Sequence, residues 1–596
     1  MKAKILETYN DRIRIFTGEF KAVLKKIRWT AFFRFLVFAV GTALTIYLFK
    51  IDNVPAFIVL AISLISFLLV VKYHGKLKDQ KKNLSFLIDI NNEEIQRLNF
   101  KTNGLDDGNE FVDNSHYYSS DLDVFGEKSL FQYLNRSATV IGTIKLATWL
   151  KNKAKKEEIE ERQKAISELK DKLDWRQQFQ ATGRIQVESG VDSKEILDWL
   201  NKDVNFAGKK IYEFLLLFLP FITIVAFILS IFVIPAKIPI LLGIFQLAFI
   251  GSHLKKINYE HSTTTKKLKL IKKYANLIAE IENESFSSAK LNNLKQKLKK
   301  DNTSAGENIQ KLSSIIGYFD NRLNMLAAIF LNGLLLWDLQ CVVRLEKWRK
   351  KYSNEFPLWF DVISEIDALS GIAGFYYNDN NLCFPIISDD NFYLKAENLG
   401  HPMIPDTERV PNDFEIDGLS RFFIITGSNM AGKSTFLRTV GVNMILAMTG
   451  APVCANNFKF SIIQIFTSMR ITDDLSNRES TFYAELKRLE QIINEVEKQD
   501  VFILLDEILK GTNSKDKLKG SKALIKQLIK EKSTGIIATH DLELAKLEDE
   551  YKQNIFNYNF EVNIDKGQFN FDYKLKKGVC KILNATELMK KMGVKV

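Results

Sequence analysis

The chain has 596 residues, 46% of them hydrophobic and 26% charged, and a formal net charge of +12 at pH 7. This length and hydrophobic content exclude a chain too small to build a core and predict several domains. The positive charge favours binding to polyanions such as DNA, RNA or anionic lipid headgroups. Alternatively, the lysines simply keep the helix surfaces solvated, and the net charge alone does not distinguish these possibilities.

The cysteines and histidines predict no special chemistry. None of the four cysteines lies in a CxxC pair, and the six histidines have no metal-ligand spacing. We therefore expect reduced structural thiols and no zinc site. The first 28 residues are charged, and no short apolar core with a cleavage site follows them. Residues 1–28 are thus predicted to be a basic cytoplasmic N-terminus without a cleavable signal.

Two apolar zones predict transmembrane helical hairpins over residues 29–72 and 211–253. A polar turn at residues 50–53 splits the first zone, and a turn with two prolines at residues 235–239 splits the second. Residues 214–236 carry no charge and are long enough to cross the hydrocarbon. The alternative is a pair of buried helical hairpins in a large soluble core.

Basic residues flank both hairpins on the same side, whereas the turns carry only Lys50 and Lys237. The positive-inside rule then places both termini, the middle segment and all large soluble parts in the cytoplasm. The predicted location is a membrane crossed several times, with a bacterial inner membrane fitting best.

The segments between the hairpins are predicted to be mainly helical. Residues 73–117 read as a short helix followed by a linker. Residues 118–210 and 254–370 carry charged helices with one apolar stripe, which predicts the two parts of a helical core with long lever helices, or ordinary bundle helices. Residues 323–337 are apolar but short and contain two asparagines, and we interpret them as a core helix.

A glycine-rich loop follows an apolar segment at residues 422–426. This is the G-x4-G-K-S pattern in the strand–loop–helix setting that cradles phosphates with backbone N–H groups and a helix N-terminus. Lys433 is expected to reach the β and γ phosphates of ATP, and the Ser434 hydroxyl to hold Mg²⁺. The predicted nucleotide-binding residues of the loop are Gly427, Ser428, Asn429, Met430, Ala431, Gly432, Lys433, Ser434 and Thr435.

Two more apolar strands end in polar residues, as this kind of site requires. The strand at 501–505 ends in Asp506, which suits Mg²⁺, and Glu507, which suits a general base for the attacking water. The strand at 535–539 ends in His540, placed to contact the γ-phosphate or the water. The residues therefore predict Mg²⁺-dependent ATP hydrolysis with Glu507 and His540 as catalytic residues.

These motifs resemble those of the MutS family of mismatch-repair ATPases. The Asn429-Met430 pair inside the loop, Gly511-Thr512 after the acidic pair, and the segment from Ser480 to Glu485 are similar to family motifs. The resemblance covers roughly residues 118–596 and implies that residues 371–596 are an ATPase domain with a C-terminal dimerisation segment. It also implies that Ser480 contacts nucleotide bound by the partner subunit of a homodimer.

The resemblance also has departures. We expect no mismatch-recognition domain before residue 118 and no nuclease domain after the last residue, and the second hairpin interrupts the lever helices near the family's DNA clamp. The expected fold is therefore an α-helical core and lever with transmembrane hairpins, followed by an α/β P-loop ATPase domain of the ABC type.

The leading hypothesis is a membrane-anchored MutS-like ATPase that binds DNA, either mismatched or branched. An ABC-type transport ATPase is the second, although the transporter signature is absent and no transported solute is expected. A membrane scaffold or signalling ATPase that binds no nucleic acid is the third.

Overall fold

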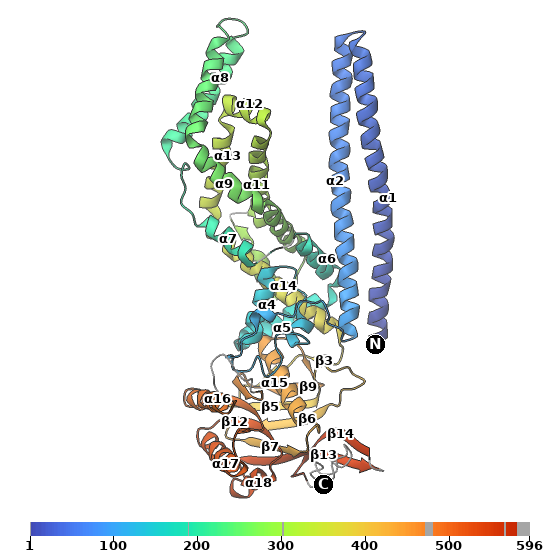
Figure 1. Ribbon diagram of the computed structural model, residues 1–596, viewed down its shortest axis with the longest axis vertical. Coiled ribbons are helices and arrows are strands. Elements are labelled where there is room, and N and C mark those ends of the chain that lie inside the picture. Colours follow the sequence, from blue (N-terminus) through green and yellow to red (C-terminus); the bar gives the residue numbers. More distant parts are fainter. Residues whose placement is uncertain are drawn as a thin grey trace.

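The computed structural model describes residues 2–186, 188, 190–300, 303–470, 481–565 and 568–580. It is an elongated, helix-rich molecule of several domains with an α/β domain at one end (Figure 1). Two separate helical hairpins reach the other end, and a helical core lies between them and the α/β domain. The coarse architecture predicted from sequence, helical core followed by an α/β region, is confirmed.

The first hairpin consists of two long antiparallel helices, α1 (Lys2–Phe49) and α2 (Asn53–Leu98). Asp52 begins α2 by accepting a hydrogen bond from the Val54 N–H at 3.1 Å. Gly41 lets the helices approach closely, since a Cβ there would lie 2.5 Å from Ser63 Oγ. We expected a separate short helix and then a linker over residues 73–117. Instead, α2 itself continues to Leu98, because apolar residues still recur on the face that packs on α1 and α6 (Leu173–Arg184).

Buried ion pairs fix the base of this hairpin to the helical core. Glu94 of α2 accepts hydrogen bonds from Arg136 at 2.7 and 2.9 Å, and the Tyr9 hydroxyl of α1 donates to Asn378 at 2.8 Å. Asn378 is the last residue of α14 (Phe356–Asn378), which leads directly into the α/β domain. Burying such charges is tolerated only when they are paired, so these contacts specify how the hairpin is seated.

The helical core is built on α14. The Asp367 carboxylate of α14 accepts hydrogen bonds from the Thr139 N–H at 2.9 Å and hydroxyl at 2.7 Å, which fixes the start of α4. Gly142 permits this contact, because a Cβ would lie 2.2 Å from the carboxylate. The other helices of this part are α3 (Leu130–Leu134), α4 (Val140–Lys151), α5 (Lys156–Asp171), α6 (Leu173–Arg184) and α7 (Gly190–Leu200), after the short η1 (Asn109–Phe111).

The second hairpin joins α8 (Lys210–Leu229) to α9 (Lys237–Asn283), whose far half runs back into the core. In the described part of the chain, four helices are long and apolar enough to cross a membrane: α1, α2, α8 and the first part of α9. The remaining elements of this half are α10 (Ala289–Lys297), β1 (Lys299–Lys300), β2 (Thr303–Ser304), α11 (Ala305–Phe319), η2 (Asp320–Leu323), α12 (Met325–Leu335) and α13 (Trp337–Tyr352).

The prediction of a core helix over residues 323–337 is wrong. In this stretch Leu323 is 72% exposed, Met325 77%, Leu326 70% and Phe330 65%. Only one side of α12 packs against the protein, on α8, α9 and α13. Apolarity alone cannot tell a helix buried in a core from one whose apolar face points outward.

The α/β domain contains a six-stranded sheet in the order β10-β11-β12-β7-β13-β14, parallel except for the β13–β14 pair. The strands β7, β11 and β12 lie where the sequence predicts them, since buried parallel strands read as unbroken apolar runs. The sheet comprises β7 (Phe422–Gly427), β10 (Gln464–Ser468), β11 (Val501–Asp506), β12 (Thr534–Thr539), β13 (Ile555–Asp565) and β14 (Gln568–Lys577).

Further strands and helices surround this sheet. A four-stranded sheet has the order β4-β9-β5-β6, and β3 pairs with β8. These strands are β3 (Leu382–Cys383), β4 (Ile386–Ile387), β5 (Tyr393–Leu399), β6 (Asn412–Asp417), β8 (Val453–Cys454) and β9 (Asn457–Phe460). The helices are α15 (Lys433–Thr449), α16 (Thr481–Val496), α17 (Ser514–Lys530), α18 (Leu542–Ala545) and α19 (Leu547–Glu550).

Helix α15 joins this domain to the helical core. It is buried along nearly its whole length, and a Cβ on Gly441 would lie 2.7 Å from Leu122 of the core. Its last turn is fixed by Arg162 of α5, which donates to the Thr449 carbonyl at 3.1 Å and stacks on Trp149. One hydrophobic cluster contains buried residues of both the helical core and the α/β domain, so a shift of α15 would displace the core residues that pack on it.

Candidate active site

The glycine-rich loop connects the buried strand β7 to the N-terminus of α15. Gly427 has φ +154° and Gly432 has φ +106°, and both approach other atoms closely. A Cβ on Gly427 would lie 2.7 Å from the Phe560 carbonyl oxygen, and one on Gly432 would lie 3.1 Å from the Tyr573 ring. Only glycine fits both positions, which leaves the loop backbone wrapped around the start of the helix. Such an arrangement presents N–H groups and a helix dipole to an anion.

Lys433 occupies the first turn of α15 and is buried. Its ammonium group donates to the carbonyl oxygens of Gly427 and Ser428, each at 2.8 Å. Burial lowers the pKa of Lys433, and the neighbouring carboxylates of Glu507 and Asp506 offset part of that effect. The glycine-rich loop therefore holds the Lys433 ammonium group against its own carbonyl oxygens, next to the N-terminus of α15.

Ser434 and Asp506 meet at the adjoining edge of the sheet. The Ser434 hydroxyl donates to Asp506 Oδ2 at 2.5 Å, so a residue of α15 and the last residue of β11 form a pair of hard oxygen ligands. Hydroxyl and carboxylate oxygens are the ligands that Mg²⁺ prefers, so this donor set fits the ion.

Glu507 follows Asp506 in a strained conformation, with φ +53°. Its N–H donates to the Ala538 carbonyl at 2.9 Å, and His540 Nδ1 lies 3.3 Å from its Oε1. Burial by itself raises the pKa of the Glu507 carboxyl. The positive charge of Lys510 and the hydrogen bond with His540 lower it by more, so the pKa lies below its ordinary value. Glu507 is thus ionised at neutral pH and can accept a hydrogen bond from water.

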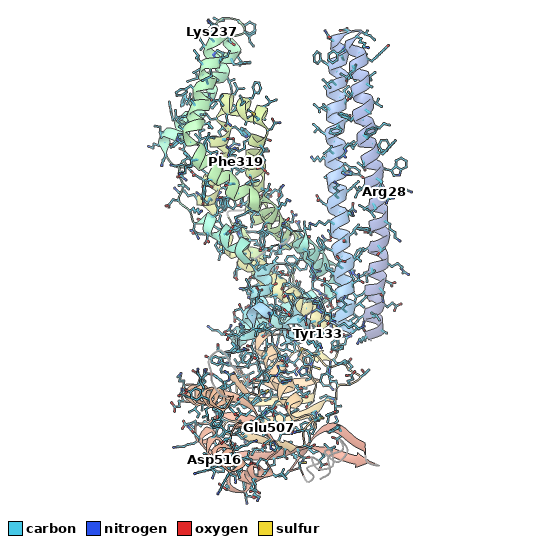
Figure 2. All side chains as sticks on the ribbon, viewed as in Figure 1. Arg28, Tyr133, Lys237, Phe319, Glu507 and Asp516 are labelled. Atoms are coloured by element: carbon cyan, nitrogen blue, oxygen red, sulfur yellow. The ribbon has the colours of Figure 1, made fainter. Side chains whose placement is uncertain are left out.

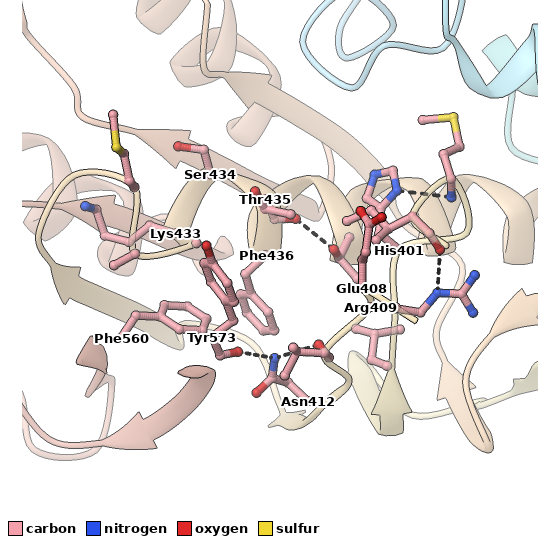
Figure 3. A pocket seen from close by; sticks show the side chains of 18 of the residues that line it. His401, Glu408, Arg409, Asn412, Lys433, Ser434, Thr435, Phe436, Phe560 and Tyr573 are labelled. Atoms are coloured by element: carbon pink, nitrogen blue, oxygen red, sulfur yellow. Dashed lines mark hydrogen bonds between the residues drawn. The ribbon is translucent and has the colours of Figure 1, made fainter. Parts of the chain in front are cut away.

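The loop opens into a cavity of about 760 Å³ that the sequence did not reveal in full. Its far wall comes from the β5–β6 connection and from β13 and β14, and Figure 3 shows these side chains facing the start of α15. Burial lowers the pKa of His401 in this wall to about 4, with Arg409 and Arg438 adding to the effect, so the ring is neutral. The labelled wall residues are His401, Glu408, Arg409, Asn412, Phe560 and Tyr573.

The residues of this wall come from two segments that the sequence analysis did not assign to the site. One contains His401 and Asn412, and the other contains Tyr573. In the structure Asn412 donates to the Tyr573 carbonyl at 3.0 Å, which joins the two segments across the cavity. Contacts between segments about 160 positions apart leave no periodic or motif signature in one sequence.

Glu485 is a second residue that sequence reasoning left without a role. It lies in the first turns of α16, and its carboxylate accepts hydrogen bonds from the N–H groups of Leu509 and, at 3.1 Å, Lys510. Leu509 has φ +59°, so these bonds stabilise an unusual backbone immediately after Glu507. The Glu485 side chain therefore positions the loop that carries the candidate base.

We expect Glu485→Ala to destabilise this loop, because the N–H groups of Leu509 and Lys510 would lose their charged acceptor. A hydrogen bond to a charged group contributes about 1.5–3 kcal/mol, and the Lys510 N–H is only partly buried and contributes less, so we expect a loss of about 2–4 kcal/mol in the free energy of unfolding. Thermal unfolding and ATP turnover measure the two effects. Glu490→Ala, on the exposed side of the same helix, is the control; equal melting temperatures for both variants would contradict the positioning role.

Comparison with known proteins agrees with this geometry. Residues 423–594 match the family described as MutS domain V. The C-terminal domain of the chain is therefore a MutS domain V. DNA mismatch repair protein MutS of Staphylococcus haemolyticus is 32% identical over 247 residues, which is 40% of this chain and 28% of that protein. The MutS proteins of Thermotoga maritima, 32% identical over 237 residues, and Prochlorococcus marinus, 33% over 255, are similarly related.

The chain spans less than a third of the length of these MutS relatives: 28%, 29% and 27%. The similarity therefore concerns the α/β domain and its immediate surroundings. In that domain, the structure brings together five of the predicted site residues at the carboxyl edge of β7, β11 and β12: Lys433, Ser434, Asp506, Glu507 and His540. Ser480 and the predicted dimerisation segment at 585–593 lie outside the described residues.

Proposed function

We propose that this protein is a membrane-anchored MutS-like ATPase. The observation that carries the ATPase part is the convergence of Lys433, the Ser434–Asp506 pair and the ionised Glu507 around one glycine-rich loop. The match of residues 423–594 to MutS domain V supports the same activity. In this proposal the cavity of about 760 Å³ takes ATP, with its phosphates at the loop and its base toward the far wall.

In the proposed hydrolysis, each residue of the site has a separate role. The loop N–H groups and Lys433 hold the phosphates, and their positive charge favours the transition state. Ser434 and Asp506 would hold Mg²⁺, which, when bound, neutralises charge on the phosphoryl oxygens. Glu507 orients the attacking water and accepts its proton, while His540 keeps the carboxylate aimed. The low pKa of Glu507 means that this base is available throughout the neutral range.

The proposed assembly is a homodimer with composite sites. By family resemblance, we propose that Ser480 of one subunit contacts the nucleotide held by Lys433 of the other. Closing the dimer on ATP and opening it after hydrolysis would move α15, and its contacts with Arg162 and Leu122 would pass that motion to the helical core. This direct packing is the reason to propose a mechanical output.

The proposed anchor is the pair of hairpins α1–α2 and α8–α9. Their outer halves expose large apolar side chains, such as Phe35, Phe57 and Phe221. Exposing so many of these side chains to water is unfavourable, whereas a bilayer would bury them. Lysines flank these parts on the side of the helical core. We therefore propose a bacterial inner membrane, with both termini and the α/β domain in the cytoplasm.

DNA is the proposed partner of the helical core, supported by the similarity to DNA mismatch repair proteins and by the net charge of +12. The test measures ATP hydrolysis by the full chain in nanodiscs with homoduplex, mismatched and branched DNA over a salt series. We expect stimulation by DNA that fades as salt rises, because phosphate contacts release counterions. Hydrolysis that is robust but indifferent to every DNA would overturn DNA binding, leave the ATPase standing, and redirect the search to protein partners.

A further inference from the structure

Helix α12 has an exposed apolar face that neither helical hairpin covers. Residues 323–337 carry no charge, and the outward side chains are Met325, Leu326, Ile329 and Phe330. An apolar surface of this kind at the tip of a domain normally has an occupant.

The other side of α12 packs on the second hairpin through glycines. A Cβ on Gly243 of α9 would lie 3.3 Å from the Gly333 carbonyl oxygen, and one on Gly333 would lie 3.8 Å from the Gly243 carbonyl oxygen. Close helix contacts through small residues are typical of helices packed within a bilayer. Gly243 lies in the apolar first part of α9, so α12 is held beside the segment proposed to cross the membrane.

The level of α12 along the molecule agrees with this placement. Figure 2 shows Phe319, the last residue of α11, at nearly the same level along the long axis as Arg28. Arg28 is the last basic residue before the exposed aromatic side chains of α1 begin at Trp29. Helix α12 follows Phe319 and lies farther toward the hairpin tips, on the apolar side of that level (Figure 1).

An ion pair and a backbone hydrogen bond close the base of α12. Arg322 and Asp338, which bracket the apolar stretch, form an ion pair at 3.2 Å. Asn332 accepts a hydrogen bond from the Asp338 N–H at 2.9 Å, and Leu336, in the left-handed conformation, is fully buried. Irregular backbone at membrane depth is tolerated where the protein covers it in this way.

Helix α12 is too short to cross a bilayer. Its 11 residues extend about 16 Å at 1.5 Å per residue, against a hydrocarbon core of about 30 Å. The chain also bends by 78° between α12 and α13 and returns toward the core. We propose that α12 is a re-entrant helix whose exposed face contacts the acyl chains of a phospholipid bilayer beside α8 and α9. This inference rests on the proposed membrane anchor, and it places the ends of the lever helices α11 and α13 at the bilayer.

The test labels single added cysteines with an environment-sensitive fluorophore in the full chain. The variants are Phe330→Cys on α12, Phe227→Cys on α8 as the membrane reference, and Leu358→Cys on α14 as the aqueous reference; all three side chains are exposed. Each protein is reconstituted at high dilution into phosphatidylcholine–phosphatidylglycerol vesicles with or without nitroxide-labelled acyl chains, and then titrated with iodide. The unsubstituted chain, labelled in parallel, gives the background from its own cysteines, most of which are buried.

We expect nitroxide lipids to quench position 330 as much as position 227 and to leave position 358 unchanged, with the reverse order for iodide. Lipid quenching at 227 together with iodide quenching at 330 would overturn the re-entrant helix and leave the anchor intact. Protection of 330 from both quenchers would also overturn it and identify a protein surface, such as a second copy, as the occupant. Failure of lipids to quench 227 would instead show that the anchor itself is wrong.

Discussion

Glu507→Gln is expected to bind ATP normally and to lose hydrolysis. The amide is the same size as the carboxylate, so it keeps the strained backbone at φ +53° and the bond from its N–H to the Ala538 carbonyl. It cannot accept a proton from water. General-base catalysis contributes about 10²–10⁴-fold, and we expect turnover to fall within that range. Single-turnover hydrolysis and nucleotide binding, measured on the same preparation, separate the two effects.

The matched control is Glu497→Gln, an exposed carboxylate in the same domain. It should change neither binding nor turnover. The pH profile adds a second check: because the pKa of Glu507 is below its ordinary value, the carboxylate stays ionised as pH falls through 6 and 5, and hydrolysis should not decline there on its account. Unchanged turnover in Glu507→Gln would place the base elsewhere and would leave only a structural role for the strained position.

Local patterns in the sequence predicted most of the fold that positions the site. Buried parallel strands are unbroken apolar runs, so β7, β11 and β12 were evident, and a glycine-rich loop between strand and helix has few other uses. Helix α12 was misassigned because a one-dimensional pattern reports how apolar a segment is and not what covers it. The same limit hid the continuation of α2 to Leu98, where polar and apolar residues alternate on a helix packed on one side only.

Motif spacing predicted which residues of the candidate site lie together, but not the full extent of the cavity. The residues proposed to act on phosphate or water each lie at the end of a strand or the start of a helix, so motif spacing was enough to select Lys433, Asp506 and Glu507. The far wall and Glu485 depend on contacts between distant segments, such as the bond from Asn412 to the Tyr573 carbonyl. Glu485 was visible only as part of a motif, because its task is to hold two backbone N–H groups 24 and 25 positions away.

Lys433→Ala is expected to abolish tight ATP binding. The ammonium group is already buried at the loop, held by two carbonyl oxygens at 2.8 Å, so it needs little reorganisation to meet a phosphate. Losing one buried, charge-assisted contact of this kind costs about 3 kcal/mol, which corresponds to a roughly 100-fold weaker Kd. Calorimetry or equilibrium dialysis with ATP measures it. Lys552→Ala, an exposed lysine in the same domain, controls for loss of net charge. Micromolar affinity in Lys433→Ala would count against phosphate binding at this loop.

The same variant tests whether the sites are composite. Lys433→Ala subunits lack their own nucleotide contact and keep Ser480, whereas Ser480→Ala subunits have the opposite defect. If Ser480 acts across the dimer, a mixed dimer regains one intact site, and random re-pairing of two-fold dimers returns roughly a quarter of the wild-type rate. If Ser480 acts within its own subunit, the mixed dimer has no intact site and mixing recovers nothing. Recovery on mixing therefore separates a dimer with shared sites from two independent ATPases, which single variants alone do not distinguish.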